Sequence, residues 1–346
     1  MSDIENTESV ENTDKDIAPF KRNHKKLSYR KGLVILTLFL LIGLIVGITQ
    51  CSSAFSEMKT RSAVTSRKSI FSLLRGEYAG ILAIEGTIEK ENNDYNQKWL
   101  LETIELLKND PQNKALIITI NSPGGSVYES DEVYLSLRSY ALEKPLYAYC
   151  ASMAASGGYY IACAAEKIYA NRNTLTGSIG VVSGQSVDLT GLLEKAGVKI
   201  TSITAGKNKN MLNFNEPLND EQKAIMQSIA DECYQQFTSI VAERRNLDPA
   251  QVQSLSDGRV YTAKQALDLA LIDGISGMDE TVEALIAAYD LSDSISLEYF
   301  KYEKEKSFLE SYLGVSSLFD LPVSETSALL RYLDSQVVFP AYYLKF

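Results

Sequence analysis

The stretch KALIITINSPGGSVYESDEVYLSLRSYALEKPLYAYCASMAASGGYYIACAA, from Lys114 to Ala165, decides the fold. Its apolar run at 114–122 predicts a buried strand, and the helical spacing of apolar residues at 130–144 predicts a helix. A second strand at 145–152 and a second helix at 154–165 repeat the pattern. Strands that alternate with helices in units of roughly 30 residues are typical of right-handed βαβ crossovers. This part of the chain is therefore predicted to be α/β, with a mostly parallel sheet.

The same alternation continues on both sides of this stretch. Upstream, a short strand at 78–88 precedes a helix at 96–110, and downstream a strand is expected at 166–173. A long amphipathic helix follows at 219–247, with Asn219 and Asp220 as its capping candidates. Two further helices are predicted at 261–275 and 278–290.

The N-terminal region predicts a membrane anchor. Residues 1–31 form a polar cytoplasmic tail that ends in a basic cluster, and residues 32–50 contain the uncharged run GLVILTLFLLIGLIVGIT. At ~1.5 Å per residue this run covers most of a bilayer core of ~30 Å. The preceding basic residues place the N-terminus inside and the rest outside. Residues 51–77 then form a juxtamembrane spacer.

Two other interpretations of this region are open. A cleaved signal peptide would usually have a shorter apolar segment and a small-x-small cleavage site, for which Ser53 and Ala54 are weak candidates. Cys51 suggests a lipoprotein, but Gln50 is bulkier than the residue that normally precedes a lipidated cysteine.

Composition excludes several classes of function. The 346 residues carry a formal net charge of −10, so a nucleic-acid partner is not expected. Cys150, Cys163 and Cys233 lie in apolar or helical surroundings and share no ligand spacing. We expect them to be buried apolar side chains, with no disulfide framework and no metal.

Ser156 has a structural and a chemical interpretation. Serine, alanine and glycine allow a helix to pack tightly against a sheet, which accounts for Ser152 and Ser156 without any chemistry. A serine at a strand-to-helix turn can also be a nucleophile, with neighbouring backbone N–H groups directed at a developing oxyanion.

The loop INSPGGSVYES, from Ile120 to Ser130, also allows two interpretations. Gly124 and Gly125 permit a tight turn after the strand, which is a common structural use. Beside Ser156, their N–H groups could instead hold a carbonyl oxygen, and the edge of the loop could pair with an extended peptide.

The histidine content limits the catalytic options. His24, in the basic flank of the predicted anchor, is the single histidine of the sequence. A Ser-His-Asp triad around Ser156 is therefore excluded within this chain, as is a zinc site with histidine ligands. A lysine can replace the histidine as base if burial makes its neutral form accessible.

Five motifs in order make the pattern specific. INSPGGSV, SMAASGGYYIACAA, TGSIGVV, AGKNKN with EPLNDEQ, and DGRVYTAKQALDLALIDGI together resemble the signal peptide peptidase A family of membrane-anchored serine peptidases. The resemblance covers about residues 78–289. It implies a crotonase-like, Clp-protease-like βαβ superhelix, with a peptidase domain at 78–290 and a C-terminal extension of unknown role at 291–346.

The family pattern implies a role for several residues. Ser156 resembles the nucleophile of a Ser/Lys dyad. Lys209 resembles its lysine, because a proline, Pro217, follows eight positions later; Lys207 is the alternative.

Ser178 of TGSIGVV resembles the residue that orients the lysine, and Gly125, Gly157 and the neighbouring Gly124 resemble oxyanion and substrate-binding positions. Asn208 and Asn210 replace residues that are usually aromatic and acidic in the family, which bears on the surroundings of the lysine.

The resemblance also implies a function. It predicts an endopeptidase that hydrolyses extended apolar peptides, such as signal-peptide remnants, at the outer face of the bacterial cytoplasmic membrane. The resemblance further implies that this enzyme needs no cofactor and that it forms a homo-oligomeric ring in which neighbouring subunits share active sites. Two alternatives are an inactive ring-forming scaffold and a crotonase-fold acyl-CoA enzyme, which would need a cytoplasmic location.

The end of the chain suggests an internal ligand. VVFPAYYLKF, at residues 337–346, is apolar, and Pro340 disfavours a helix, so this tail could lie extended in the groove of a peptidase. The alternative is a tail that packs on its own domain or on a neighbouring subunit.

Overall fold

The computed structural model describes residues 76–304 and 341–343. The description below concerns the unit Arg75–Phe346 of the chain. The predicted cytoplasmic tail at 1–31 and the predicted anchor at 32–50 lie outside the described residues. Within the described ranges, no helix is long and apolar enough to cross a membrane.

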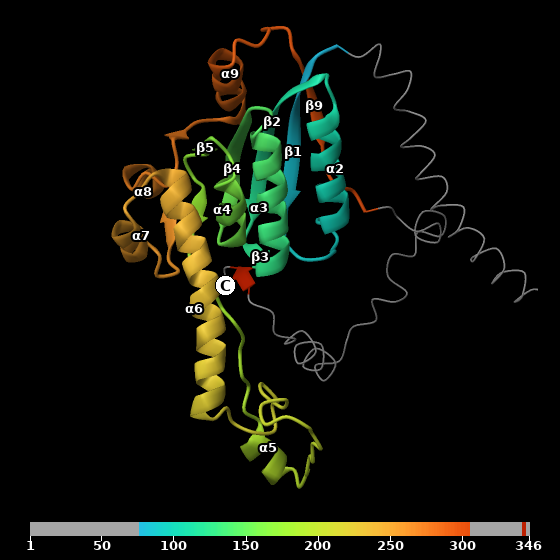
Figure 1. Cartoon of the computed structure of the whole chain (residues 1–346), viewed down its shortest axis with the longest axis vertical. Helices are drawn as coiled ribbons and strands as arrows, with labels where there is room; N and C mark the ends of the chain where they lie inside the picture. Colours follow the sequence, from blue (N-terminus) through green and yellow to red (C-terminus); the bar gives the residue numbers. More distant parts are fainter. Residues whose placement is uncertain (1–75, 305–340, 344–346) are drawn as a thin grey trace, which may run out of the picture. The chain divides into compact units, whose positions relative to one another are not determined.

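A mostly parallel sheet forms the centre of this unit, as predicted (Figure 1). Its main path has the order β7-β6-β4-β2-β1-β9, and β5 pairs with both β4 and β8. Every pairing is parallel except that of β6 with β7. The strands are β1 (Tyr78–Glu85), β2 (Asn113–Ser122), β4 (Leu146–Ala155), β5 (Lys167–Ala170), β6 (Leu175–Gly177), β7 (Val260–Thr262), β8 (Gly274–Ile275) and β9 (Ser296–Phe300).

Helices cover both faces of the sheet. One buried cluster joins the sheet to α2, α3, α4 and the C-terminal half of α6, and a second joins the opposite face to α9. The helices are α2 (Gln97–Asn109), α3 (Val127–Ala141), α4 (Gly157–Ala162), α5 (Thr190–Lys195), α6 (Asp220–Arg245), α7 (Pro249–Leu255), α8 (Ala263–Asp268) and α9 (Met278–Ala288).

The central strand β2 shows why the apolar run at 114–122 is continuous. Leu116, Ile118 and Ile120 pack into the cluster with α2, α3 and α4, whereas Ala115 and Ile117 pack into the cluster with α9. Successive side chains of a strand point to opposite faces, and both faces of this sheet are covered. The strand therefore needs apolar residues at nearly every position.

Helix α6 begins as its sequence predicts. The Asn219 side chain accepts a hydrogen bond from the Gln222 N–H, and the Gln222 side chain accepts one from the Asn219 N–H. This reciprocal capping box satisfies two donors at the start of the helix. Asn219 is thus confirmed as the N-cap, and Asp220 is the first residue inside the helix.

Helix α4 is shorter than the helix predicted at 154–165. Strand β4 continues to Ala155, so the helix starts only at Gly157. After Ala162 the chain tightens, with Ala164 N–H donating to the Ile161 carbonyl and Ala165 N–H to the Ala162 carbonyl. Such i to i−3 bonds end a helix and turn the chain toward the next element, here β5.

The segment after residue 290 adds to the fold. β9 pairs in parallel with β1, from Tyr78 opposite Ser296 to Leu82 opposite Phe300, and forms one edge of the sheet. A further strand, β10 (Ala341–Tyr343), belongs to a separate two-stranded sheet with β3 (Gly124–Ser126).

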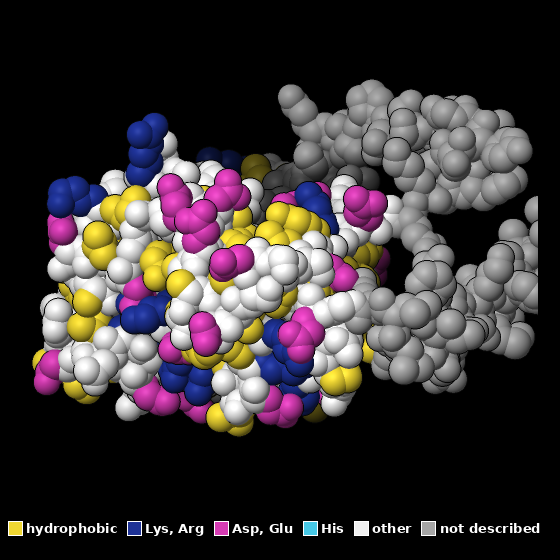
Figure 2. Space-filling model, turned by 90° about the horizontal axis from the view of Figure 1, so that it is seen from above, with side chains coloured by type: hydrophobic (Ala, Val, Ile, Leu, Met, Phe, Trp, Pro, Cys, Tyr) yellow, Lys and Arg dark blue, Asp and Glu magenta, His cyan; other side chains and the backbone are white. Residues whose placement is uncertain are grey.

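The surface seen in Figure 2 mixes both signs of charge. Acidic and basic side chains are interspersed on this face among hydrophobic ones. Such a mixture is typical of a solvated surface.

Asp273 holds three elements together just before β8. Its carboxylate accepts a hydrogen bond from Arg245 of α6 at 2.8 Å and one from the Ile168 N–H of β5 at 2.8 Å. Burial raises the pKa of Asp273, but these hydrogen bonds outweigh burial, and the net pKa lies below the ordinary value. The ionised carboxylate therefore contributes stability to the fold.

We expect Asp273→Ala to lower the free energy of unfolding by about 3–5 kcal/mol, because it leaves the buried Arg245 guanidinium unpaired. Lys167→Met removes a partner that is 45% exposed and should cost under about 1 kcal/mol. Since the folded pKa is depressed, the contribution of Asp273 is present above about pH 4 and is lost as the pH falls further. Urea unfolding across this pH range measures both effects, and equal losses in the two variants would contradict the assignment.

Candidate active site

The carboxyl ends of three neighbouring strands bring the predicted site residues together. β2 and β4 run in parallel with Ser122 opposite Ala154, and β4 and β6 run in parallel with Ala155 opposite Gly177. Parallel strands end at the same edge, where open α/β sheets place their sites. Gly124, Ser156 and Ser178 each follow one of these strand ends.

Ser156 occupies a sharp turn between β4 and α4. Its φ is 53° and its ψ is −115°, a backbone conformation that residues with a side chain rarely adopt. The Ser156 N–H donates to the Gly177 carbonyl at 2.7 Å, and the residue is 1% exposed. Its side chain does not cap α4. The turn therefore leaves the hydroxyl free of the capping role that a serine commonly has before a helix.

Ser178 repeats this arrangement on the adjacent strand. It follows β6 directly, with a φ of 49°, and is buried. Its N–H donates to the Arg259 carbonyl at 2.8 Å, which joins it to the chain before β7. Because Gly177 accepts the Ser156 N–H, the two serines lie on adjoining turns of one sheet edge.

The glycine loop is held in place by Ile88. The Ile88 N–H donates to the Gly124 carbonyl at 2.9 Å, and the Ser126 N–H donates to the Ile88 carbonyl at 2.8 Å. A Cβ on Gly125 would lie 1.8 Å from the Ile88 carbonyl oxygen. Any side chain at Gly125 would therefore displace the backbone of this loop.

The two glycines differ in what their N–H groups do. The Gly124 N–H donates to the Ser122 hydroxyl at 3.1 Å. The Gly124 carbonyl and the Ser126 N–H both face Ile88, and backbone groups alternate along a strand. The N–H and carbonyl of Gly125 consequently face the opposite edge of β3, where an extended peptide could pair.

The last described strand lies on that edge. β10 pairs antiparallel with β3, with Ala341 opposite Ser126, Tyr342 opposite Gly125 and Tyr343 opposite Gly124 (the short red strand in Figure 1). Of the two interpretations of the tail, this pairing favours the extended one for Ala341–Tyr343. Tyr342 is therefore the register partner of Gly125, whose N–H and carbonyl face β10.

Two tyrosines hold α4 in position. The Tyr159 hydroxyl donates to the Leu271 carbonyl at 2.7 Å, and the Tyr160 hydroxyl donates to Asp131 of α3 at 2.6 Å. Gln236 of α6 donates to the Tyr160 oxygen at 2.7 Å. These contacts fix the short helix, and with it Ser156, against α3 and α6. Sequence reasoning missed them, as it missed Ile88, since nothing local marks which distant residues meet.

The structure does not bring Lys209 or Lys207 to Ser156 within one chain. Both lysines are exposed in the segment 183–218, which contains α5 and lies at the end of α6 remote from the sheet (Figure 1). Lys207 pairs with Glu221 in the first turn of α6. From Glu221 to Phe237, which contacts Tyr160, the helix rises about 24 Å.

Comparison with known proteins identifies the family. The profile of peptidase family S49 matches residues 139–292, which include Ser156, Ser178 and Lys209. A putative protease of Synechocystis is 36% identical over 217 residues, or 63% of this chain and 76% of that protein. This chain belongs to peptidase family S49. By family, therefore, it is a serine peptidase.

Other S49 relatives carry more specific names. A putative signal peptide peptidase SppA of Enterococcus faecium is 34% identical over 221 residues, which span 64% of this chain and 63% of that protein. The chloroplastic serine protease SPPA of Arabidopsis thaliana is 34% identical over 203 residues, covering 58% of this chain and 30% of that protein. Among solved structures, a ClpP1 mutant of Listeria monocytogenes matches with a TM-score of 0.40 and 18% identity, covering 57% of this chain and 92% of that chain.

Proposed function

We propose that this S49 peptidase is a membrane-anchored endopeptidase that hydrolyses extended apolar peptides with a Ser156/Lys209 dyad. The observation that carries the proposal is the strained turn at Ser156, which stands between Ser178 and the glycine loop on one edge of the sheet. Strain of this kind concentrates at functional sites, because folding alone would favour a relaxed turn.

The proposed mechanism uses residues of the chain alone. Neutral Lys209 takes the proton of the Ser156 hydroxyl, and the Ser156 oxygen attacks the peptide carbonyl carbon. The N–H groups of Gly125 and Gly157 hold the oxyanion; the Gly157 N–H, in the first turn of α4, has no carbonyl partner within the helix. The lysine then gives its proton to the leaving amine, and water hydrolyses the acyl-enzyme. Ser178 orients the lysine.

In this proposal Lys209 reaches the site from a neighbouring subunit. The segment 183–218 exposes several apolar side chains, among them Ile203, which is 97% exposed, and Leu192, which is 60% exposed. These exposed side chains favour a second copy of the chain as partner for this segment, within a closed homo-oligomeric ring.

Substrates would bind by strand addition to β3. A main-chain hydrogen bond from the peptide to the Gly125 carbonyl would supply affinity with little sequence preference, as in other complexes in which a peptide extends a sheet edge. The pairing of β10 with this edge supports the proposal, because it shows the geometry accepting an extended antiparallel segment.

The tail therefore competes with added substrate in this proposal. We expect removal of the residues after Ser335 to lower the apparent KM for an added peptide by about 3- to 10-fold, because a larger fraction of sites is open. Steady-state hydrolysis of a peptide by the full chain and the truncated chain, compared as assembled oligomers, measures the effect.

A point variant tests whether the effect of the truncation comes from the backbone pairing of the tail with β3. Proline has no N–H to donate to the Gly125 carbonyl, so Tyr342→Pro should lower KM as the truncation does. The pH at half-maximal rate should stay the same in both variants. An unchanged KM in a correctly assembled truncation would rule out the tail as an occupant of the site.

The predicted anchor sets the proposed location. The uncharged run at 32–50 and the basic residues before it favour a single-pass protein of the cytoplasmic membrane with the catalytic unit outside. Signal-peptide remnants are then accessible substrates, since they are apolar and remain at the membrane. The name of the Enterococcus faecium relative, a putative signal peptide peptidase, supports this substrate class.

The test of the proposed function is covalent labelling of the full chain with a fluorophosphonate, followed by mass mapping of the modified residue. Labelling at Ser156 together with hydrolysis of an apolar peptide is the expected result. A chain that assembles but neither reacts nor hydrolyses peptides would instead be the inactive scaffold.

A further inference from the structure

A pocket of about 580 Å³ lies at the amino-terminal edge of the sheet, on the side opposite the catalytic edge. It opens beside the start of β4 at Leu146 and the residue before β5, Glu166. Ser156 and Ser178 follow the carboxyl ends of β4 and β6, so this pocket is distinct from the candidate active site.

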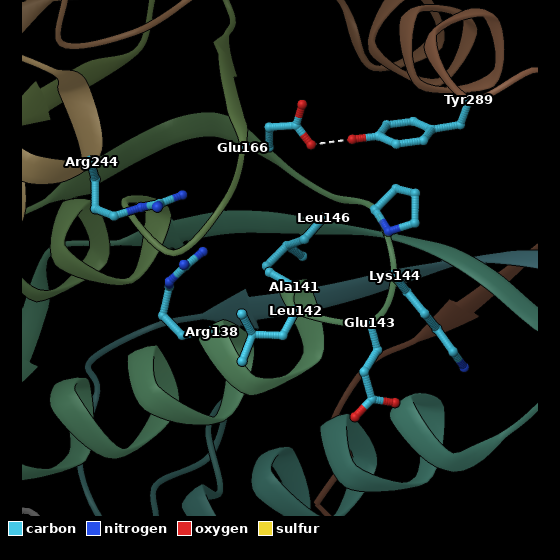
Figure 3. A pocket seen from close by; sticks show the side chains of 10 residues that line it. Arg138, Ala141, Leu142, Glu143, Lys144, Leu146, Glu166, Arg244 and Tyr289 are labelled. Atoms are coloured by element: carbon cyan, nitrogen blue, oxygen red, sulfur yellow. Dashed lines mark hydrogen bonds between the residues drawn. The ribbon is translucent and has the colours of Figure 1, made fainter.

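Two arginines from different helices converge in this pocket. Arg138 of α3 donates to the Ala164 carbonyl at 3.2 Å. Arg244 of α6 donates to the Cys163 carbonyl at 3.1 Å and to the Ala165 carbonyl at 3.4 Å. Because these carbonyls are consecutive, the two guanidinium groups are neighbours, and Figure 3 shows them on the same side of the pocket.

Neither guanidinium has an acidic partner among the described residues. One of the two acids in the lining, Glu166, accepts a hydrogen bond from the Tyr289 hydroxyl. Figure 3 shows Glu143 and Lys144 directed away from the arginines, and Lys144 donates to the Leu107 and Asp110 carbonyls. Each arginine has five N–H donors, and the carbonyls use only one of Arg138 and two of Arg244.

The rest of the lining is largely apolar. Ala141, Leu142, Pro145 and Leu146 form the wall next to the arginines. Two unpaired cations beside an apolar wall match a ligand that has an anionic oxygen group at one end and an aliphatic group at the other. A carboxylate suits a guanidinium, because its two oxygens can accept parallel N–H bonds.

We propose that this pocket binds a small aliphatic carboxylate, such as the carboxyl end of an apolar acyl amino acid or short peptide, through Arg138 and Arg244. The carboxylate accepts the free N–H donors of both arginines, and the aliphatic group contacts Leu142 and Pro145. The site is independent of Ser156, so it can be tested whether or not the proposed peptidase mechanism is correct.

The test is thermal unfolding of the full chain in the presence of N-acetyl-leucine. N-acetyl-leucinamide, which has an uncharged amide in place of the carboxylate, is the control ligand. We expect N-acetyl-leucine alone to raise the midpoint, since a ligand that binds only the folded state stabilises it. Arg138→Gln and Arg244→Gln should each weaken the Kd about tenfold or more, the effect of losing a charge-assisted hydrogen bond. Arg172→Gln, which changes an exposed arginine outside this pocket, should leave the Kd unchanged.

A second variant guards against loss of folding, because both arginines also bind backbone carbonyls. Leu142 is 80% exposed, so Leu142→Asp should fold while placing a negative charge in the lining. It should weaken N-acetyl-leucine binding and leave peptide hydrolysis unchanged. No shift with N-acetyl-leucine, an equal shift with the amide, or a shift that persists in Leu142→Asp and both glutamine variants would overturn the proposal.

Discussion

Ser156→Ala is expected to abolish peptide hydrolysis, with a loss of about 10⁴- to 10⁶-fold in kcat, the range found when a serine nucleophile is removed. The backbone at this position already accommodates a Cβ at a φ of 53°, so alanine adds no new backbone strain. The loss should therefore be chemical, with an unchanged unfolding midpoint. Hydrolysis of an apolar peptide in single-turnover and steady-state assays measures it.

Ser152→Ala is the matched control for this result. Ser152 lies on the same strand and in the same stretch of small residues, but it is exposed and four positions before the turn. We expect this variant to retain most of the activity. Full activity in Ser156→Ala would end the enzymatic interpretation of the sheet edge.

Lys209→Met is expected to lower kcat by several orders of magnitude, because methionine keeps an apolar chain of similar length but cannot accept the Ser156 proton. Lys207→Met should have a mild effect, since Lys207 pairs with Glu221 at the exposed start of α6. The pH profile provides a second measurement. A lysine base works only in its neutral form, so kcat/KM of the unaltered chain should rise with pH.

Mixing the two inactive variants tests whether active sites are shared between subunits. In rings assembled from equal amounts of Ser156→Ala and Lys209→Met chains, about a quarter of the sites combine an intact serine with an intact lysine from the neighbour. Activity should return to about a quarter of the normal value. If the dyad instead formed within one chain, the mixture would stay inactive. In the comparison of the single variants, a larger loss in Lys207→Met than in Lys209→Met would assign the dyad to Lys207.

The parallel α/β fold could be predicted from the sequence because its signals are local. The run at 114–122 requires a strand covered on both faces, and the capping pattern at Asn219 starts a helix wherever that segment packs. The serine and glycine turns could also be predicted, because they directly follow apolar runs in the sequence. Their meeting at one place follows from the parallel sheet, in which the carboxyl ends of the strands lie at one edge. The length of α4 could not be predicted, because β4 continues to Ala155 and because arginines of two other helices bind the carbonyls that follow Ala162.

The sheet and the serine and glycine turns at its edge follow from local periodicity and composition, which need no knowledge of distant contacts. Composition also excludes a histidine base, since His24 of the predicted anchor flank is the single histidine. Only the tertiary structure decided that Ile88 holds Gly125, that Tyr342 faces that glycine, and that Lys209 lies away from Ser156 of its own chain. These are relations between residues far apart in sequence. They depend on how the helices and the long α6 pack, and no local pattern encodes that packing.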